Sequence, residues 1–204
     1  MEITTSTIKE LREATAAGVL DCKKALEASG GDLEKAKTYL REKGLASVAK
    51  RADRAAEEGL IEAYIHTGSR AGALIELNCE TDFVARTDAF KKLAHDLAMQ
   101  LVAAKPLYLA PEDIPPDALE KEKEIYQAQA RDMGKPERII EKIVEGKLQK
   151  YYQEVCLMEQ PFIKDDELTV QDVLTQAISK TGENIMVRRF ARFELGDSEA
   201  SLSS

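Results

Sequence analysis

Apolar residues recur at helical spacing through the first part of the chain. Three stripes share this spacing: Ile8, Leu11 and Ala14; Val19, Cys22, Ala25 and Leu26; and Leu33, Ala36 and Leu40. Such stripes are typical of amphipathic helices that bury one face. We therefore predict a three-helix bundle over residues 1–45, followed by a connecting helix over residues 46–57.

Polar and glycine residues mark the expected ends of these helices. Thr7 and Glu10 have the spacing of a capping box, in which a hydroxyl and a carboxylate each bind an unpaired amide at a helix start. Gly18 is expected to end the first helix, and Asp32 is placed to cap the third. Gly44 is expected to close the bundle.

The middle of the chain changes from helical spacing to alternation. Apolar positions alternate with polar ones through Ile75, Glu76, Leu77, Asn78 and Cys79. This period is typical of a half-buried strand. With the apolar run 60–65 and a polar turn that contains His66, it predicts a β-hairpin. Helical spacing then resumes at Phe90, Leu93, Leu97 and Leu101, which predicts a core hairpin and helix over residues 58–115.

A charged region with a sparse apolar seam follows, over residues 116–155. The seam alternates spacings of three and four: Leu119, Tyr126, Ala130 and Met133, then Ile140, Val144, Leu148, Tyr151 and Val155. Two helices, 117–132 and 137–154, joined at Gly134, would bring the two seams together. We predict an antiparallel helical hairpin of the coiled-coil kind.

The remaining residues, 156–196, are expected to return to the core sheet. A short strand near Phe162 precedes a helix that starts at Thr169. A final strand over 185–195 is expected to bury Val187, Phe193 and Leu195. The polar tail, 197–204, is expected to fray. The predicted fold class is α+β: an N-terminal three-helix, UBA-like bundle, then an α+β core with a small antiparallel sheet and a protruding helical hairpin.

Composition supports a helical core. Hydrophobic residues make up 44% of the 204 residues, aromatic residues only 5%, and there is no Trp. The formal net charge of −8 repels phosphates and argues against a broad nucleic-acid surface. A local basic patch at Lys50, Arg51 and Arg54 remains open, although a solvated helix face explains it better.

Cysteine usage and hydropathy indicate a cytoplasmic protein. The three cysteines, Cys22, Cys79 and Cys156, lie far apart and form no CxxC pair, which favours reduced thiols. The N-terminus is acidic and polar, unlike a signal peptide. No apolar run approaches the roughly 20 residues of a membrane helix.

The chain carries little that suggests catalysis. Its two histidines, His66 and His95, have no carboxylate or cysteine at ligand spacing, and phosphate-binding glycine loops are missing. A nucleophile, base and orienter could be assembled from Cys22, His66 and Asp82. Cys22 falls on an apolar helix face, however, where a small buried hydrophobe is the default. We predict no catalytic residue, no metal site and no cofactor, hence no enzyme.

The segment from Thr81 to Val84 lies where the predicted strand meets a helix. Thr81 is placed to cap this helix, and Asp82 favours the positive end of its dipole. Phe83 has two interpretations: it faces outward, or it folds back as a staple against the core. Spacing alone favours the second, and the residues alone leave the choice open.

Two stretches resemble the elongation factor Ts family. Residues 11–26 (LREATAAGVLDCKKAL) are similar to its N-terminal signature, and residues 76–86 (ELNCETDFVAR) match a second signature almost unaltered. Ala16 stands where the family usually has Gly, and Val19-Leu20 replaces a Met pair. The length resembles the short members, which have a single core repeat, and this implies a homodimer.

The resemblance implies a function and a partner. The chain would be a guanine-nucleotide exchange factor for elongation factor Tu, binding its GDP-bound and nucleotide-free forms. Phe83 would wedge into the partner while Thr81, Asp82 and Val84 disturb the Mg²⁺ site. The N-terminal module would contact the partner's nucleotide domain, the domain that Phe83 enters, through Val19, Leu20 and Lys23. The core, with His66, would contact the partner's other domains.

Rival interpretations of the residues remain. A helical bundle of this size also suits a protein-interaction module with an RNA-associated role, because fold does not decide function. A thiol enzyme built around Cys22 or Cys79 is a third class.

Overall fold

The computed structural model describes residues 3–15 and 17–197. The departure from the family at Ala16 and the tail beyond Asp197 lie outside the described residues. The chain divides into two compact units. The first contains residues 1–62, 75–95 and 171–190, and the second contains residues 63–74, 96–170 and 191–204.

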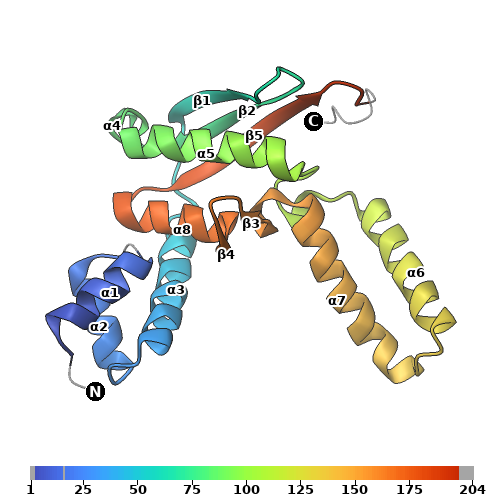
Figure 1. The fold of residues 1–204 in the computed structure, drawn as a ribbon, viewed down its shortest axis with the longest axis horizontal. Helices are drawn as coiled ribbons and strands as arrows, with labels where there is room; N and C mark the ends of the chain where they lie inside the picture. The colour runs from blue at the N-terminus through green and yellow to red at the C-terminus, as the bar shows by residue number, and fades with distance from the viewer. Residues whose placement is uncertain (1–2, 16, 198–204) are drawn as a thin grey trace. The chain divides into compact units, whose positions relative to one another are not determined.

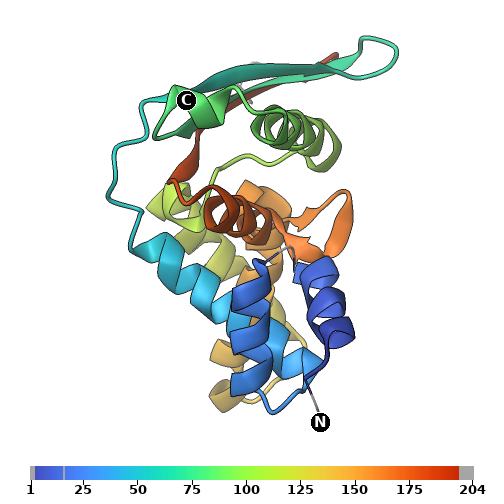
Figure 2. The ribbon, with the colours of Figure 1, turned by 90° about the vertical axis from the view of Figure 1, so that its left-hand side faces the viewer.

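Three helices open the first unit: α1 (Thr5–Thr15), α2 (Val19–Ala28) and α3 (Leu33–Ala49). They pack together as an N-terminal module (Figures 1 and 2). Its core consists of fully buried side chains from all three helices: Leu11, Cys22, Ala25, Leu26 and Ala36. The predicted three-helix bundle is therefore confirmed, and its apolar stripes form the core.

Two helix ends differ from the prediction. Helix α1 starts at Thr5, three residues earlier than a cap at Thr7 predicts, because Thr4 and Thr7 cap each other: the Thr7 amide donates to Thr4 Oγ1 (3.2 Å) and the Thr4 amide to Thr7 Oγ1 (3.1 Å). Gly44 does not end α3, which continues to Ala49. Of the connecting helix expected over residues 46–57, only residues 46–49 are helical, as the end of α3; turns and irregular backbone follow.

Helix α3 continues through Gly44 because its later turns contact α8 (Val170–Thr181). A Cβ on Gly44 would lie 3.0 Å from Thr175 Cγ2, so glycine allows the two helices to approach closely. Arg41 forms a bidentate ion pair with the nearly buried Asp172, with Nε–Oδ1 and Nη2–Oδ2 distances of 3.0 Å. Tertiary contact with α8 thus outweighs the weak helix propensity of glycine.

The small antiparallel sheet has the strand order β1 (Glu58–Ile65), β2 (Ala71–Cys79), β5 (Ile185–Glu194). The predicted hairpin and the return of the last strand beside it are confirmed. Gly59 has φ 148°, and a Cβ there would lie 2.2 Å from the Leu77 carbonyl oxygen, so only glycine fits this close strand approach.

Helix α5 (Asp88–Ala104) buries the predicted apolar face, including Phe90 and Leu97. It is joined to β1 by His95, whose Nδ1 lies 2.8 Å from Glu62 Oε1.

The burial predicted for β5 is right only at its start. Val187 is buried, whereas Phe193 and Leu195 are more than half exposed. The alternation breaks at Arg188 and Arg189, which are both exposed, so the residues beyond them lose the register that period two predicts.

Within the second unit, α6 (Pro116–Asp132) and α7 (Glu137–Val155) form the predicted antiparallel hairpin (Figure 1). Ala130, Ile140, Val144 and Leu148 form its small core. Met133, predicted to lie in the seam, is 63% exposed because it follows the last turn of α6, where the chain turns at Gly134.

Short elements complete the second unit. They are the 3₁₀ turns η1 (Pro111–Asp113) and η2 (Leu157–Glu159) and the antiparallel strand pair β3 (Pro161–Phe162) and β4 (Asp165–Thr169). Strand β4 was not predicted, because its acidic sequence does not alternate with apolar residues. The described helices include none with the length and hydropathy needed to cross a membrane.

Candidate functional site

The segment predicted to carry function forms a one-turn helix, α4 (Asp82–Ala85), directly after β2. Thr81 caps it as expected: its backbone is extended, and its Oγ1 accepts from the Val84 amide at 3.4 Å. Thr87 then caps α5 in the same way, accepting from the Phe90 amide at 3.2 Å. Two caps in close succession turn the chain sharply between strand and helix.

The Phe83 side chain is 81% exposed. A turn this short has one buried position, which Ala85 occupies, and Phe83 therefore points outward. The staple that spacing favoured is wrong. The exposed ring therefore forgoes, within this chain, the free energy that burial of its apolar surface would give.

Asp82 supplies the negative charge at this corner. One of its carboxylate oxygens, Oδ2, lies 2.8 Å from Arg86 Nη2, one helical turn later. The aspartate sits in the first turn of α4, where the helix dipole favours an anion. The charged pair flanks the exposed ring without covering it.

A second loop, which the sequence analysis missed, supports the corner. Glu183 accepts from both the amide and the hydroxyl of Thr81, at 3.1 and 2.6 Å. In return, Glu80 accepts from the Asn184 amide at 2.6 Å. The only local signal was Gly182, whose φ of 75° ends α8 just before these residues.

The N-terminal residues expected to contact a partner lie at the start of α2. Leu20 is 73% exposed and Val19 is 53% exposed, although Val19 also belonged to a predicted apolar stripe. Lys23 is exposed and lies 3.8 Å from Glu27. As the first residue of α2, Val19 precedes the turns that pack into the module. These residues form an exposed face with two apolar side chains and a cation, which we call the α2 face.

His66 belongs to the other compact unit, in the exposed turn between β1 and β2. Its Nδ1 lies 3.1 Å from the Tyr64 hydroxyl, which orients the ring. The structure therefore leaves it accessible.

The cysteines are buried and unreactive in character. Burial raises the pKa of the Cys22, Cys79 and Cys156 thiols, that of Cys156 to about 12. Cys22 lies in the core of the N-terminal module, which does not suit the imagined nucleophile. Among residues 3–15 and 17–197, no three His, Cys, Asp or Glu side chains gather as they would around a metal ion.

The basic residues left open as an RNA-binding patch take part in internal contacts. Arg51 Nε donates to the Gly182 carbonyl at 3.0 Å, and Arg54 Nη1 lies 3.5 Å from Glu80 Oε1. They lie in turns after α3 and not on the helix face expected for them, although Lys50 and Arg54 are exposed to solvent as expected.

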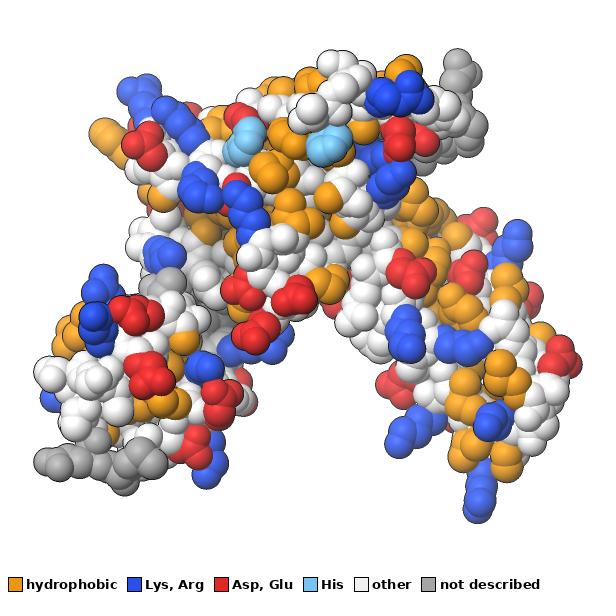
Figure 3. Space-filling view, viewed as in Figure 1, with side chains coloured by type: hydrophobic (Ala, Val, Ile, Leu, Met, Phe, Trp, Pro, Cys, Tyr) orange, Lys and Arg blue, Asp and Glu red, His pale blue; other side chains and the backbone are white. Residues whose placement is uncertain are grey.

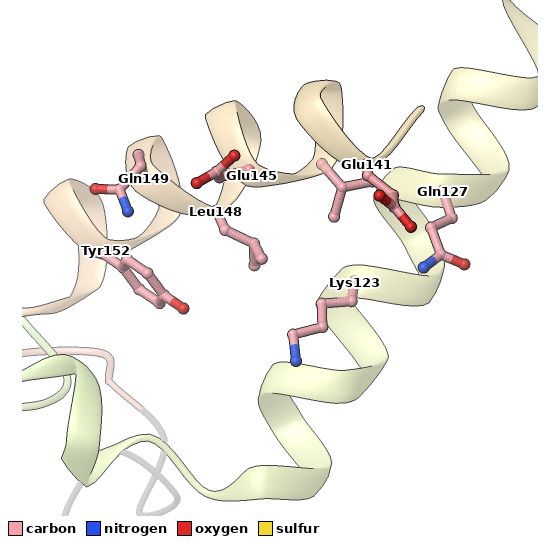
Figure 4. Close-up of a pocket in the computed structure, with 8 residues that line it drawn as sticks. Lys123, Gln127, Glu141, Glu145, Leu148, Gln149 and Tyr152 are labelled. Atoms are coloured by element: carbon pink, nitrogen blue, oxygen red, sulfur yellow. The ribbon is translucent and has the colours of Figure 1, made fainter. Parts of the chain in front are cut away.

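An open groove runs between the arms of the α6–α7 hairpin (Figure 4). It has a volume of about 250 Å³ and is lined by Lys123, Gln127, Glu141, Val144, Glu145, Leu148, Gln149 and Tyr152. Hydrophobic side chains lie on the hairpin surface beside Lys and Arg (Figure 3). The open shape and a volume below the roughly 300–1,000 Å³ of ligand pockets do not resemble a small-molecule site.

Comparisons with known proteins agree with the signature residues. The family profile described as Elongation factor TS matches residues 3–197. Elongation factor Ts of Carboxydothermus hydrogenoformans is 60% identical over 195 residues, covering 96% of this chain and 90% of that protein. The protein of that name from Thermotoga petrophila is 59% identical, covering 97% of this chain and 98% of its own length. The chain therefore belongs to the elongation factor Ts family of translation elongation factors.

Proposed function

We propose that this chain is a cytoplasmic guanine-nucleotide exchange factor for elongation factor Tu. The observation that carries the proposal is the exposed Phe83 ring at a capped corner, inside the family's second signature. Family membership supports the partner. The proposed partner forms are the GDP-bound and nucleotide-free ones, and no nucleic acid is needed.

Phe83 acts as a wedge in this proposal. Burying an aromatic side chain covers roughly 150–250 Å², which corresponds to a gross gain of about 4–6 kcal/mol before ordering costs. The ring already points outward, so little rearrangement of this chain is needed before docking. The gain offsets part of the free energy with which the partner holds GDP.

Asp82 and its neighbours Thr81 and Val84 accompany the ring into the partner. The ion in a GTPase bridges phosphate oxygens and neutralises their charge, so a displaced Mg²⁺ weakens nucleotide binding. The chain forms and breaks no covalent bond in this process and has no catalytic residue. Reciprocity then requires that GDP weaken binding of the factor as much as the factor weakens binding of GDP.

Further contacts would hold the partner in place. The α2 face provides a small apolar patch beside a cation, and His66 provides an accessible imidazole on the other unit. A homodimer would cover the apolar side chains of Ile65 and Leu74, which are exposed in the second unit.

Release of a fluorescent GDP analogue from purified elongation factor Tu tests the proposal. Catalytic amounts of this chain are expected to accelerate release at least tenfold over the spontaneous rate. A release rate unchanged at saturating concentration of the chain would contradict the exchange function. Retention of the chain on RNA, weakening steeply with salt, would support the RNA-associated role instead.

A further inference from the structure

The turn between α8 and β5 connects three separate segments of the first unit. Gly182 ends α8, with its amide donating to the Ile178 carbonyl at 2.8 Å. The next two residues, Glu183 and Asn184, are half-buried and buried. We call Gly182–Asn184 the clasp turn, because each of its residues binds another segment.

The clasp turn binds the Phe83 corner through reciprocal carboxylate bonds. Glu183 receives the Thr81 amide on Oε2 and the Thr81 hydroxyl on Oε1, while Glu80 receives the Asn184 amide. Hydrogen bonds to a charged acceptor are about twice as strong as neutral ones. Thr81 is the residue that caps α4. The Glu183 carboxylate therefore fixes both the backbone of the capping residue and the hydroxyl that forms the cap.

The clasp turn also binds the segment that leaves the N-terminal module. Arg51 Nε donates to the Gly182 carbonyl, and Asn184 Nδ2 donates to the Arg54 carbonyl at 2.9 Å. Arg54 in turn lies beside Glu80. The chain that follows α3 and the corner that carries Phe83 are therefore held by the same three residues.

We infer that Glu183 and Asn184 are positioning residues for nucleotide exchange: they touch no partner and fix the direction in which Phe83 is presented. The inference rests on the proposed function. A helix of a single turn has almost no stability of its own. Without the bonds from Glu183, the Thr81 cap loosens and the ring samples many directions, so more entropy is lost on docking.

A purely structural role for Glu183 makes a different prediction. In that case its loss would lower the stability of the whole chain and reduce partner binding and exchange together. The positioning role instead predicts a lower exchange rate constant at saturation, with the half-saturating concentration set by the α2 face and nearly unchanged.

The first experiment needs no partner. Because the chain has no Trp, Phe83→Trp creates a single fluorescent reporter at the corner. In this background, Glu183→Ala is expected to lower the fluorescence anisotropy of the reporter and raise its quenching by acrylamide by about twofold. Glu183→Gln keeps an acceptor oxygen and should restore most of the anisotropy. Glu167→Ala, on the exposed part of β4, is the matched control and should change neither value.

The second experiment measures GDP release with Phe83 in place. Glu183→Ala should lower the maximal release rate about tenfold, Glu183→Gln less than about threefold, and Glu167→Ala should leave it unchanged. If Glu183→Ala fails to fold, Glu80→Ala against Glu80→Gln removes and retains the acceptor of the Asn184 amide, with the same expectations.

The outcomes separate the two proposals. Unchanged reporter anisotropy in Glu183→Ala overturns the positioning role, whatever the exchange rate. A changed anisotropy with an unchanged release rate also overturns it. If the unaltered chain does not accelerate GDP release, the exchange function itself fails, while the anisotropy still decides whether Glu183 holds the corner.

Discussion

The Phe83 corner and the α2 face both expose apolar side chains, but the chain supports them in different ways. The corner is bound by one carboxylate from a distant loop, that of Glu183, and by two successive threonine caps. The α2 face is the first turn of an ordinary helix whose opposite side packs into a small core. The hydrogen bonds of the corner fix the direction of its side chains, whereas the packing of α2 fixes only the position of the helix that carries the α2 face.

This difference predicts a division of roles. A rigidly presented ring can force a change in a partner, because the strain of docking is not relieved within this chain. A pair of apolar side chains on a helix surface adds affinity wherever a complementary surface exists. We therefore expect the corner to determine the maximal exchange rate and the α2 face to determine the half-saturating concentration.

Truncating the ring should have the largest effect. Phe83→Ala removes the exposed side chain and is expected to lower the maximal rate of GDP release at least tenfold. The melting temperature should be unchanged, since the ring packs against little in this chain. A stopped-flow release assay with a thermal melt of the same sample checks both. Release at the unaltered rate would disprove the wedge.

Truncating the α2 face should have a smaller and different effect. Leu20→Ala is expected to raise the half-saturating concentration about fivefold, corresponding to roughly 1 kcal/mol of binding, with the maximal rate preserved. Titration of the factor in the same assay separates the two quantities. A lower maximal rate with unchanged half-saturation would reverse the roles assigned to the two regions. Glu10→Ala, exposed on α1, serves as the control.

Removing the helical hairpin sharpens the comparison further. Replacing residues 117–154 by a short glycine–serine linker is expected to raise the half-saturating concentration less than about threefold, because neither contact region lies on the hairpin. The hairpin has its own core, so the remainder should keep its far-ultraviolet signal apart from the lost helix. Loss of all exchange in a folded variant would place an essential contact on the hairpin.

The helix cap of the N-terminal module should have the smallest effect. The Lys35 amide donates to Asp32, which lowers the pKa of this carboxyl group. A lowered pKa in the folded state stabilises the fold above the unfolded pKa, near 4, and the gain is lost as pH falls through the folded value. Asp32→Ala should lower Tm by about 2 °C at pH 7 and by less at pH 3. An equal shift at both pH values, or the same shift in Glu42→Ala, would exclude the cap as its cause.

Periodicity was sufficient to predict most elements. The β-hairpin, α5 and the two arms of the helical hairpin follow from patterns within single segments, and their bounds differ little from the prediction. The start of α1 and the end of α3 could not be predicted from such patterns. Two threonines three residues apart offered alternative caps, and the contact of Gly44 with Thr175 depends on a segment far along the chain.

The candidate site shows the same limit. The signature residues Thr81 and Asp82 were found, and the cap was predicted from residue type alone. The direction of the Phe83 side chain was not predicted, because a helix of one turn is too short for a hydrophobic periodicity that would identify its buried face. Glu183 was missed because it lies 102 residues from Thr81, and one acidic residue after a glycine has no distinctive pattern.

Helix α3 makes two contacts whose relative direction around the helix axis depends on the number of residues between them. Ala36 contributes to the core of the N-terminal module, and Arg41, little more than one turn later, pairs with α8. An inserted or deleted residue between them would turn one contact relative to the other by about 100°. We therefore expect substitutions in that turn to be tolerated and changes of length not to be. The number of residues between Ala36 and Arg41 determines the rotation of the N-terminal module, and with it the α2 face, about the axis of α3.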